Sequence, residues 1–369
     1  MKSVKFVEDK IFRLRLSVAL VYRNGIMEFF KTNVRESVNI KTEHNLIEFL
    51  QNFDGKNSVK EILKITNFDK ESVINLINFL NKKFILIEIN EKYDEDLLQE
   101  NYRIINFLED YFSKTSDVIR TIENLSDKKV IIFGLGGVGS WVADTLARSG
   151  VKNFILVDDD IVDETNLHRQ DFYTQSMVGM AKIDCIQKNL EKISNINVEK
   201  IYEKLDEDFF LRHNLKFDLA INCADYPNVD TTTKIIGKEC MKRKIKHIVG
   251  GGYNLHLTLI GQAIIPFETA CYKCFDTALS NINLPPLQGV KKLYRQNRKI
   301  GSFTPLCTIS ASIASLEAFK ILCGLDEFLT TTSRRIEFAL KDMDFKILQI
   351  PKNENCKVCS NENHGHKNT

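Results

Sequence analysis

The stretch KVIIFGLGGVGS (129–140) decides the fold of this chain. Its first half is an apolar run typical of a buried strand, and in its second half Gly134, Gly136 and Gly139 fit the pattern G-x-G-x-x-G. The following WVADTLARSG has the pattern of a helix. Glycines between a strand and a helix let the backbone turn tightly and approach a phosphate at the positive end of the helix dipole. The stretch therefore predicts a nucleotide site, with an unliganded glycine turn as the alternative.

Further buried strands follow along the chain. NFILVDDD (153–160) ends in three acids, and FDLAINCAD (217–225), IKHIVGGGY and LIGQAIIP come after helical stretches. Strands that alternate with helices indicate an α/β fold with a mostly parallel, doubly wound sheet of the Rossmann kind. Asp158 ends the second strand, 24 residues after Gly134, where an acid can bind ribose hydroxyls. On these residues alone the ligand is NAD, FAD or ATP.

Polar residues beyond the second strand favour a triphosphate over a dinucleotide. The run DDDIVDETNLHRQ (158–170) supplies acids, an Asn and an Arg, while GMAK (179–182) and NCAD (222–225) add a Lys and another acid. Lys and Arg can neutralise charge that develops on a leaving phosphate, and carboxylates can hold Mg²⁺. We therefore expect ATP and Mg²⁺ at this site.

The nine cysteines include two C-x-x-C pairs, Cys271 with Cys274 and Cys356 with Cys359. Two such pairs make a tetrahedral four-thiolate Zn²⁺ site, which leaves no open position for catalysis. We expect a structural zinc, with unpaired thiols as the alternative, because disulfides are rare in a reducing compartment. Of the five other cysteines, we expect Cys223, in a predicted buried strand, and Cys323, in an apolar helix, to pack in the core. Cys307, in SFTPLCTISAS, stays open as a candidate nucleophile, although thioester transfer is not supported.

The composition excludes several classes of protein. The chain has 369 residues, of which 43% are hydrophobic and 27% charged, so it can form a globular core. Lys+Arg 51 against Asp+Glu 49 gives a formal charge of +2, which lacks the basic field typical of nucleic-acid binding. The sequence has no run of 18 apolar residues, and its start, MKSVKFVEDK, is charged where a signal peptide is apolar. We expect a cytoplasmic protein with no nucleic-acid or membrane partner.

The first 90 residues have a different pattern from the rest. Two short strands flank Arg23-Asn24-Gly25, a typical hairpin turn, and three helical segments follow, for which Ser58 and Asp69 are candidate caps. FILIEI (84–89) then predicts a strand. We therefore expect a winged-helix-like α+β domain over residues 1–90, a charged helical connector over 91–127 and a nucleotide-binding domain over 128–369.

Residues 128–360 resemble the ThiF-like adenylating enzymes related to ubiquitin-activating enzymes. The motifs that carry the resemblance are the GLGGVG loop, the run from Asp158 to Gln170, a Lys thirteen residues after the Arg, and the acid that ends NCAD. The family's reaction is attack of a substrate carboxylate on the α-phosphorus of ATP, which gives an acyl-adenylate and pyrophosphate.

The resemblance implies a role for each matching residue. The glycine loop, which includes Gly137, and Asp158, Asp160, Asn166, Arg169 and Lys182 would bind ATP. Within this set Asp158 would hold the ribose, and Asn166, Arg169 and Lys182 the phosphates. Asp225 would hold Mg²⁺, and Asp160 would assist the phosphates and the metal. Arg169, Lys182 and Asp225 are the expected catalytic residues, and the four cysteines the expected zinc ligands.

The first domain resembles the peptide-recognition element of pathways that modify ribosomally made peptides. Together the two parts are similar to the peptide-tailoring branch of the family, which includes the enzymes that mature microcin C and pantocin. The resemblance implies a homodimer that adenylates a side-chain or C-terminal carboxylate of a precursor peptide for cyclisation or nucleotide conjugation. The basic segment 291–299 matches the family's crossover loop, and Arg103 or Arg120 is a candidate for an arginine supplied across the dimer.

Two alternatives stay open on the sequence. The first is adenylation of the C-terminal glycine of a ubiquitin-like sulfur-carrier protein. The second is a non-catalytic subunit that presents a peptide to a partner enzyme. A simple packing appendage is the alternative reading of the first domain.

Overall fold

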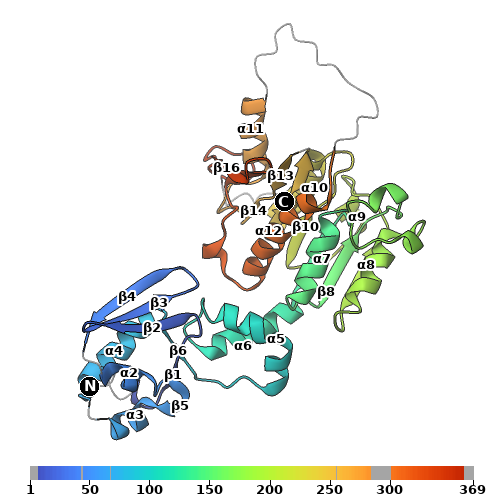
Figure 1. Cartoon of the computed structure of the whole chain (residues 1–369). Helices are drawn as coiled ribbons and strands as arrows, with labels where there is room; N and C mark the ends of the chain where they lie inside the picture. The colour runs from blue at the N-terminus through green and yellow to red at the C-terminus, as the bar shows by residue number, and fades with distance from the viewer. Residues whose placement is uncertain (1–6, 43–44, 67, 255, 284–300, 361–369) are drawn as a thin grey trace, which may run out of the picture. The chain divides into compact units, whose positions relative to one another are not determined.

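The computed structural model of the chain describes residues 7–42, 45–66, 68–254, 256–283 and 301–360. The chain divides into two compact units, Met1–Glu123 and Asn124–Thr369 (Figure 1). The basic segment 291–299 lies outside the described residues.

The first unit contains two small antiparallel sheets, with strand orders β5-β1-β6 and β2-β3-β4. They share one apolar core with the helices, which includes Phe29, Phe49 and Ile77. The elements of this unit are β1 (Ile11–Leu14), β2 (Val18–Arg23), β3 (Ile26–Lys31), β4 (Glu36–Lys41), α2 (Asn45–Leu50), β5 (Asp54–Ser58), α3 (Val59–Ile65), α4 (Lys70–Lys82), β6 (Leu86–Glu88) and α5 (Glu95–Leu108). Helix α6 (Thr115–Asp127) runs across the division between the units.

The local signals in this unit are confirmed. Asn24 and Gly25 have positive φ angles of 51° and 77°, as the tight turn between β2 and β3 requires. Ser58 and Asp69 cap α3 and α4, since each side chain accepts a backbone N–H from the first turn of its helix. The sequence did not predict β1, β4 or β5, because these strands are short or polar.

Most of the segment 91–127, which the sequence suggested as a connector, belongs to the first unit. Both carboxylate oxygens of the buried Glu109 accept hydrogen bonds from Arg13 on β1, at 2.6 and 2.7 Å. The buried Arg15 donates to the carbonyl of Phe112 at 2.8 Å. Buried charges need partners of opposite sign or hydrogen bonds, and these contacts tie the segment to β1.

The second unit is built on a six-stranded sheet, and the predicted mostly parallel, doubly wound fold is confirmed. The strand order is β14-β11-β10-β7-β8-β9, in which five strands are parallel and only β14 is antiparallel among those described. The strands are β7 (Lys129–Phe133), β8 (Asn153–Val157), β9 (Asn197–Ile201), β10 (Leu219–Asn222), β11 (His247–Val249) and β14 (Ala263–Ile264).

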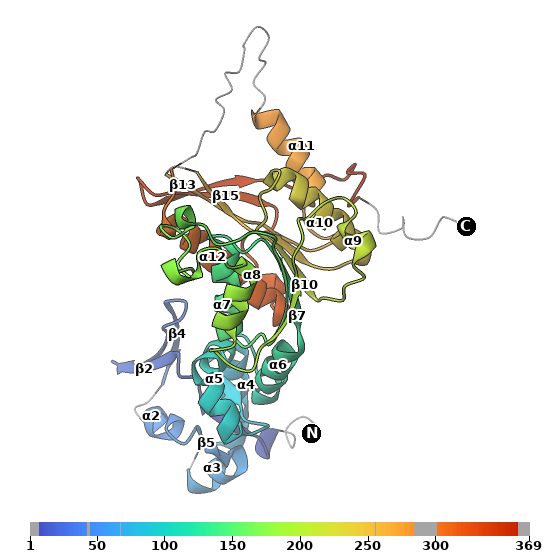
Figure 2. The ribbon, with the colours of Figure 1, turned by 90° about the vertical axis from the view of Figure 1, so that its right-hand side faces the viewer.

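Helices cover both faces of this sheet. On one side lie α7 (Gly139–Arg148), α8 (Lys182–Leu190) and α12 (Thr304–Leu322), and on the other α9 (Phe209–Arg212) and α10 (Val229–Arg243) (Figure 2). Helix α12 is long and apolar enough to cross a membrane by length and composition, but 67% of its apolar window is buried inside the structure. It packs against α7 and β13 (Leu257–Ile260), as a core helix does.

A four-stranded antiparallel sheet, order β12-β13-β15-β16, completes the second unit and was not predicted. It contains β12 (Gly252–Asn254), β15 (Arg334–Ala339) and β16 (Asp344–Gln349). The stretch LIGQAIIP, expected as one strand, is divided between β13 and β14. Gly261 lies at the break, where an added Cβ would stand 1.6 Å from the carbonyl oxygen of Val249. Helix α11 (Tyr272–Asn283) follows β14.

Candidate active site

A cleft of about 1320 Å³ lies in the second unit, around the loops that follow β7, β8 and β10. In an open α/β sheet, ligands bind at this edge, outside the carboxyl ends of the parallel strands. The cleft brings together nine of the ten residues predicted for the nucleotide site, namely Gly134, Gly136, Gly137, Asp158, Asp160, Asn166, Arg169, Lys182 and Asp225. Gly139 does not line the cleft.

The glycine loop is shaped by close backbone packing. Gly134 has a φ of +82°, and an added Cβ would stand 2.7 Å from the carbonyl oxygen of Cys223. A Cβ on Gly139 would stand 1.9 Å from the carbonyl oxygen of Gly134, so this glycine lets α7 begin directly against the loop. At Gly136 the nearest atom to an added Cβ is the Gln170 amide, 3.8 Å away. The loop therefore has room on its cleft side for a ligand at Gly136.

Asp158 joins the glycine loop to the strand end beside it. One carboxylate oxygen accepts the backbone N–H of Leu135 at 2.5 Å, and the other accepts that of Asp160 at 2.8 Å. Burial raises the pKa of Asp158, against the two backbone donors and the Lys182 charge, which lower it. Each oxygen keeps a further lone pair, which can accept a hydrogen bond from a hydroxyl group of a ligand.

The cationic residues of the cleft differ in their partners. Lys182, the first residue of α8, is buried, and its Nζ lies 2.7 Å from Oδ2 of the largely exposed Asp160. Arg169 donates to the carbonyl of Thr165 at 2.7 Å and forms no ion pair with any carboxylate in the described part of the chain. Asn166 accepts the backbone N–H of Asp163 at 3.1 Å. No carboxylate of the described residues therefore compensates the charge of Arg169, whereas Asp160 compensates that of Lys182.

The cleft also offers carboxylates for a divalent cation. Oxygens of Asp158, Asp159 and Asp160 lie within 4.8 Å of one another. Asp225, on the loop after β10, is exposed and lines the same cleft. Carboxylate oxygens are the ligands that Mg²⁺ prefers, so the residues present fit this metal.

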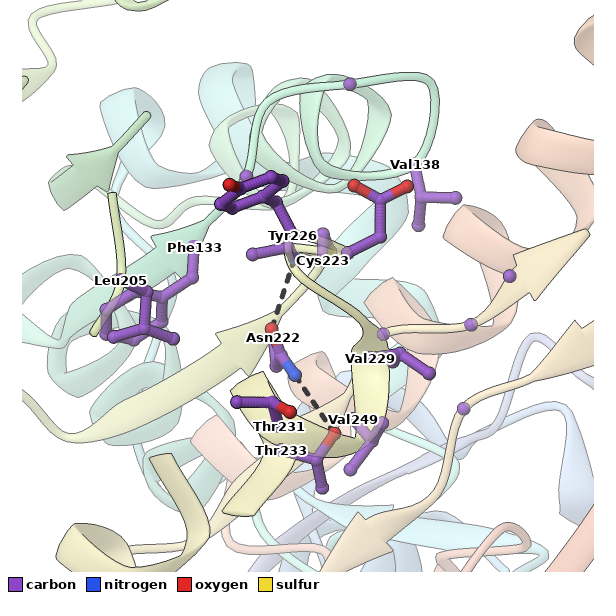
Figure 3. A pocket seen from close by; sticks show the side chains of 18 of the residues that line it. Phe133, Val138, Leu205, Asn222, Cys223, Tyr226, Val229, Thr231, Thr233 and Val249 are labelled. Carbon is purple, nitrogen blue, oxygen red and sulfur yellow. Dashed lines mark hydrogen bonds between the residues drawn. The ribbon is translucent and has the colours of Figure 1, made fainter. Parts of the chain in front are cut away.

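Gln170 and Asn222 are two of the polar cleft residues that the sequence prediction did not assign. Gln170 is 4% exposed, and its Oε1 has no hydrogen-bond partner among the described residues, so it is available to a ligand donor. The sequence feature that could have identified Gln170 is its position next to Arg169 in the NLHRQ motif. Asn222 donates to the hydroxyls of Thr232 and Thr233 at 3.0 and 3.1 Å and accepts the N–H of Ala224 (Figure 3). It thereby fixes the turn that carries Asp225.

The four predicted metal-binding cysteines come together next to the cleft without lining it themselves. Their sulfurs lie within 4.8 Å of one another, and the contacts measure 3.9 Å for Cys271 to Cys274, 3.6 Å for Cys271 to Cys356 and 3.4 Å for Cys274 to Cys359. Four sulfurs at about 2.3 Å from a tetrahedral Zn²⁺ would be about 3.8 Å apart. The four buried thiols therefore fit zinc in both donor type and spacing.

Four of the remaining cysteines are buried, and Cys223 is partly buried in the wall of the cleft. Burial raises the pKa of Cys223 and of Cys323 to about 12, which disfavours a thiolate. Cys307 is fully buried at the start of α12, and its sulfur would be 2.8 Å from a Cβ added to Gly137. This burial argues against Cys307 as a nucleophile.

Comparisons with known proteins agree on the fold and divide on the substrate. A model described as the ThiF family matches residues 112–358. The molybdopterin-synthase adenylyltransferase of Haemophilus influenzae is 31% identical over 55% of this chain and 80% of its own length. The molybdopterin-synthase adenylyltransferase of Escherichia coli is 24% identical over 73% of this chain and 98% of its own length. The E. coli sulfur carrier protein ThiS adenylyltransferase is 26% identical over 65% of this chain and 89% of its own length.

Solved structures with the same fold cover more of the chain. E. coli MccB in complex with MccA-N7isoASN has a TM-score of 0.75 and 21% identity, over 95% of this chain and 99% of MccB. MccB, described as the microcin C7 biosynthetic enzyme, is also solved with N-formylated MccA and with ATP. PaaA has a TM-score of 0.69 and 20% identity, over 91% of this chain and 99% of its own.

Proposed function

The chain belongs to the ThiF family of adenylyltransferases, and from that premise we propose that it transfers AMP from ATP to a carboxylate of a ribosomally made precursor peptide. The adenylate would activate a side-chain or C-terminal carboxyl group for cyclisation or nucleotide conjugation, in the manner of peptide antibiotic pathways. The proposal includes a homodimer as the working form.

The extent of the two kinds of match supports a peptide substrate. The E. coli molybdopterin-synthase adenylyltransferase aligns with 73% of this chain while using 98% of its own length. MccB covers 95% of this chain with 99% of its own. About a quarter of this chain therefore has no counterpart in that E. coli relative. The structure of MccB, in contrast, has a counterpart for nearly the whole chain.

The contacts in the cleft suggest how the residues divide the reaction. Asp158 would accept the ribose hydroxyls with the lone pairs that Leu135 and Asp160 leave free. Arg169 and Lys182, with Asn166, would bind the phosphates. Because Lys182 now pairs with Asp160, we expect the far more negative triphosphate to draw its ammonium group away from that carboxylate.

The chemical step needs little of the protein beyond position and charge. An oxygen of the acceptor carboxylate would form a bond to the α-phosphorus, and the bond from that phosphorus to the pyrophosphate oxygen would break. Negative charge grows on the leaving pyrophosphate, where Arg169 and Lys182 would stabilise it. Mg²⁺, held by Asp225 and assisted by Asp160, would neutralise phosphate charge when bound. The zinc held by the four cysteines would stabilise the fold.

The first unit offers a place for the peptide. In the sheet β2-β3-β4, the outer edges of β2 and β4 pair with no other strand in the described part of the chain. Val21, on the edge strand β2, is 48% exposed. An open edge with apolar side chains can accept an extended peptide as an added strand. We propose that the precursor peptide binds to this sheet.

Adenylation of a sulfur-carrier protein is the second candidate, because the curated relatives by sequence act on such carriers according to their names. A non-catalytic peptide-presenting subunit is less consistent with the cleft, which keeps all the charged residues expected for a triphosphate. A subunit that only presents a peptide would not require them.

Pyrophosphate exchange separates these possibilities. The full chain is incubated with ATP, Mg²⁺ and labelled pyrophosphate, together with a candidate precursor peptide or with E. coli ThiS. We expect exchange only with the peptide, and mass spectrometry should detect its adenylate or a product derived from it. Exchange with ThiS and none with the peptide would favour the carrier, and no exchange with either would remove the catalytic proposal.

A further inference from the structure

Tyr226 is an exposed aromatic side chain in the wall of the cleft that the sequence prediction did not assign. It follows Asp225 on the loop after β10, and 66% of its surface is open to solvent. It nevertheless lines the cleft, and its ring lies above Cys223 in the close-up of the pocket (Figure 3). A large exposed aromatic group in a binding cleft is a candidate surface for a flat ligand.

The contacts of Tyr226 place it at one particular end of the cleft. Strand β8 leads to Asp158, and β9 lies next to β8 in the sheet, with Val157 paired to Ile201. Lys204 follows β9, and its Nζ lies 4.6 Å from the centre of the Tyr226 ring. The loop that carries Tyr226 contacts the glycine loop at Gly134, but the contact with Lys204 places the Tyr226 ring toward the residues that follow β9, on the Asp158 side of the cleft.

In a nucleotide fold this side is where the base lies. The phosphates bind at the first glycine loop and the ribose at the acid that ends the next strand. The base, on the far side of the ribose from the phosphates, must then lie near the residues that follow β8 and β9. Apolar side chains are present there, because Val157 and Leu205 line the cleft and belong to one core cluster.

Lys204 contacts both the Tyr226 ring and a carboxylate of the cleft. Besides contacting the ring, its ammonium group lies 3.5 Å from Oδ2 of Asp159. A cation between a carboxylate and an aromatic face is attracted to both, so it restrains the ring more than either contact alone. The three side chains come from three different loops, all of which line the cleft.

We propose that Tyr226, held by Lys204 and Asp159, is the surface on which the nucleobase of ATP stacks. The assignment rests on the proposed ATP-dependent function and adds a residue that determines how the nucleoside is held. Stacking on an aromatic ring strengthens binding substantially, and its loss should weaken ATP binding about 5- to 50-fold.

The test compares ATP with inorganic triphosphate, which has the phosphates but no base. Dissociation constants of the full chain are measured by calorimetry with Mg²⁺ present. We expect Tyr226→Ala to weaken ATP binding about 10-fold and to change triphosphate binding less than twofold. Tyr226→Phe, which keeps the ring, should stay within threefold of the unmodified protein for both ligands, and Lys204→Met should weaken ATP binding by a smaller factor.

Tyr202 provides a matched control. Tyr202 is 49% exposed, and Nζ of Lys200 lies 5.6 Å from the centre of its ring. Lys200 also forms an ion pair with Asp184. This second Tyr-Lys-Asp group does not line the cleft. Tyr202→Ala should leave both constants unchanged. Equal losses for ATP and triphosphate in Tyr226→Ala, or no loss for ATP, would overturn the stacking proposal. Failure of the unmodified protein to bind ATP would instead refute the proposed function.

Discussion

Replacing Lys182 by Met should separate catalysis from stability. Methionine keeps an apolar stem of similar length in the buried position and removes only the charge. The partner, Asp160, has a side chain that is 61% exposed, so it would stay hydrated without the lysine, and the cost in free energy of unfolding should be at most about 1 kcal/mol. The loss of a cation that stabilises the leaving pyrophosphate should instead lower the rate about 10²-fold or more, equivalent to about 2.7 kcal/mol.

The assay is pyrophosphate exchange with saturating peptide, read together with the melting temperature. Lys200→Met is the matched control, because Lys200 forms an ion pair of similar length, 2.8 Å, with Asp184 and does not line the cleft. We expect the control to keep its rate. A Lys182→Met protein that exchanges within fivefold of the unmodified one, while folded, would refute the role given to this lysine.

Four further outcomes are expected. Arg169→Ala should also lower exchange 10²-fold or more with an unchanged melting temperature, because among the described residues its guanidinium bonds only to the exposed Thr165 carbonyl; near-normal exchange would contradict this. Metal analysis should find about one zinc per chain, and Cys356→Ser should lower the melting temperature before it affects exchange in the folded fraction; protein purified without chelator and free of zinc would exclude the site. Gly139→Ala should destabilise the fold, because its Cβ would overlap the Gly134 carbonyl, whereas Gly136→Ala should keep the melting temperature and weaken ATP binding; equal melting temperatures would disprove the packing argument. Removal of residues 1–114, which leaves α6 whole, should abolish submicromolar peptide binding and keep the dissociation constant for ATP within a fewfold; unchanged peptide affinity would make the first unit an appendage.

The sequence predicted those parts of the second unit whose structure depends on residues close together in the chain. The apolar runs of β7, β8 and β10 are buried on both faces, so their sequences are continuous rather than alternating. The glycine loop directly follows β7 and the run from Asp158 directly follows β8, and the sequence predicted that both belong to one nucleotide site. The two C-x-x-C pairs lie together in the structure, as a shared four-sulfur site requires.

Other features depend on contacts between distant residues, which a single sequence does not reveal. Strand β5 has the sequence DGKNS, which no strand propensity favours, and it forms only because β1 pairs with it. The link between Arg13 and Glu109 joins positions 96 residues apart and makes a predicted connector part of a folded unit. Tyr226 and Lys204 have ordinary local sequences, and only their meeting in the cleft suggests a role.

Helix α11 has a consequence for how this enzyme can evolve. Cys271, just before this helix, and Cys274, in its first turn, belong to the four-cysteine cluster, while Tyr272 and Lys273 between them line the cleft. Because one helical turn holds 3.6 residues, any mutation that tilts this turn moves both sites together. Substitutions in this turn must therefore preserve both the four-cysteine cluster and the cleft. New acceptor preferences should arise more readily from α10 or β15, whose Lys234 and Arg335 line the cleft but hold no metal ligand.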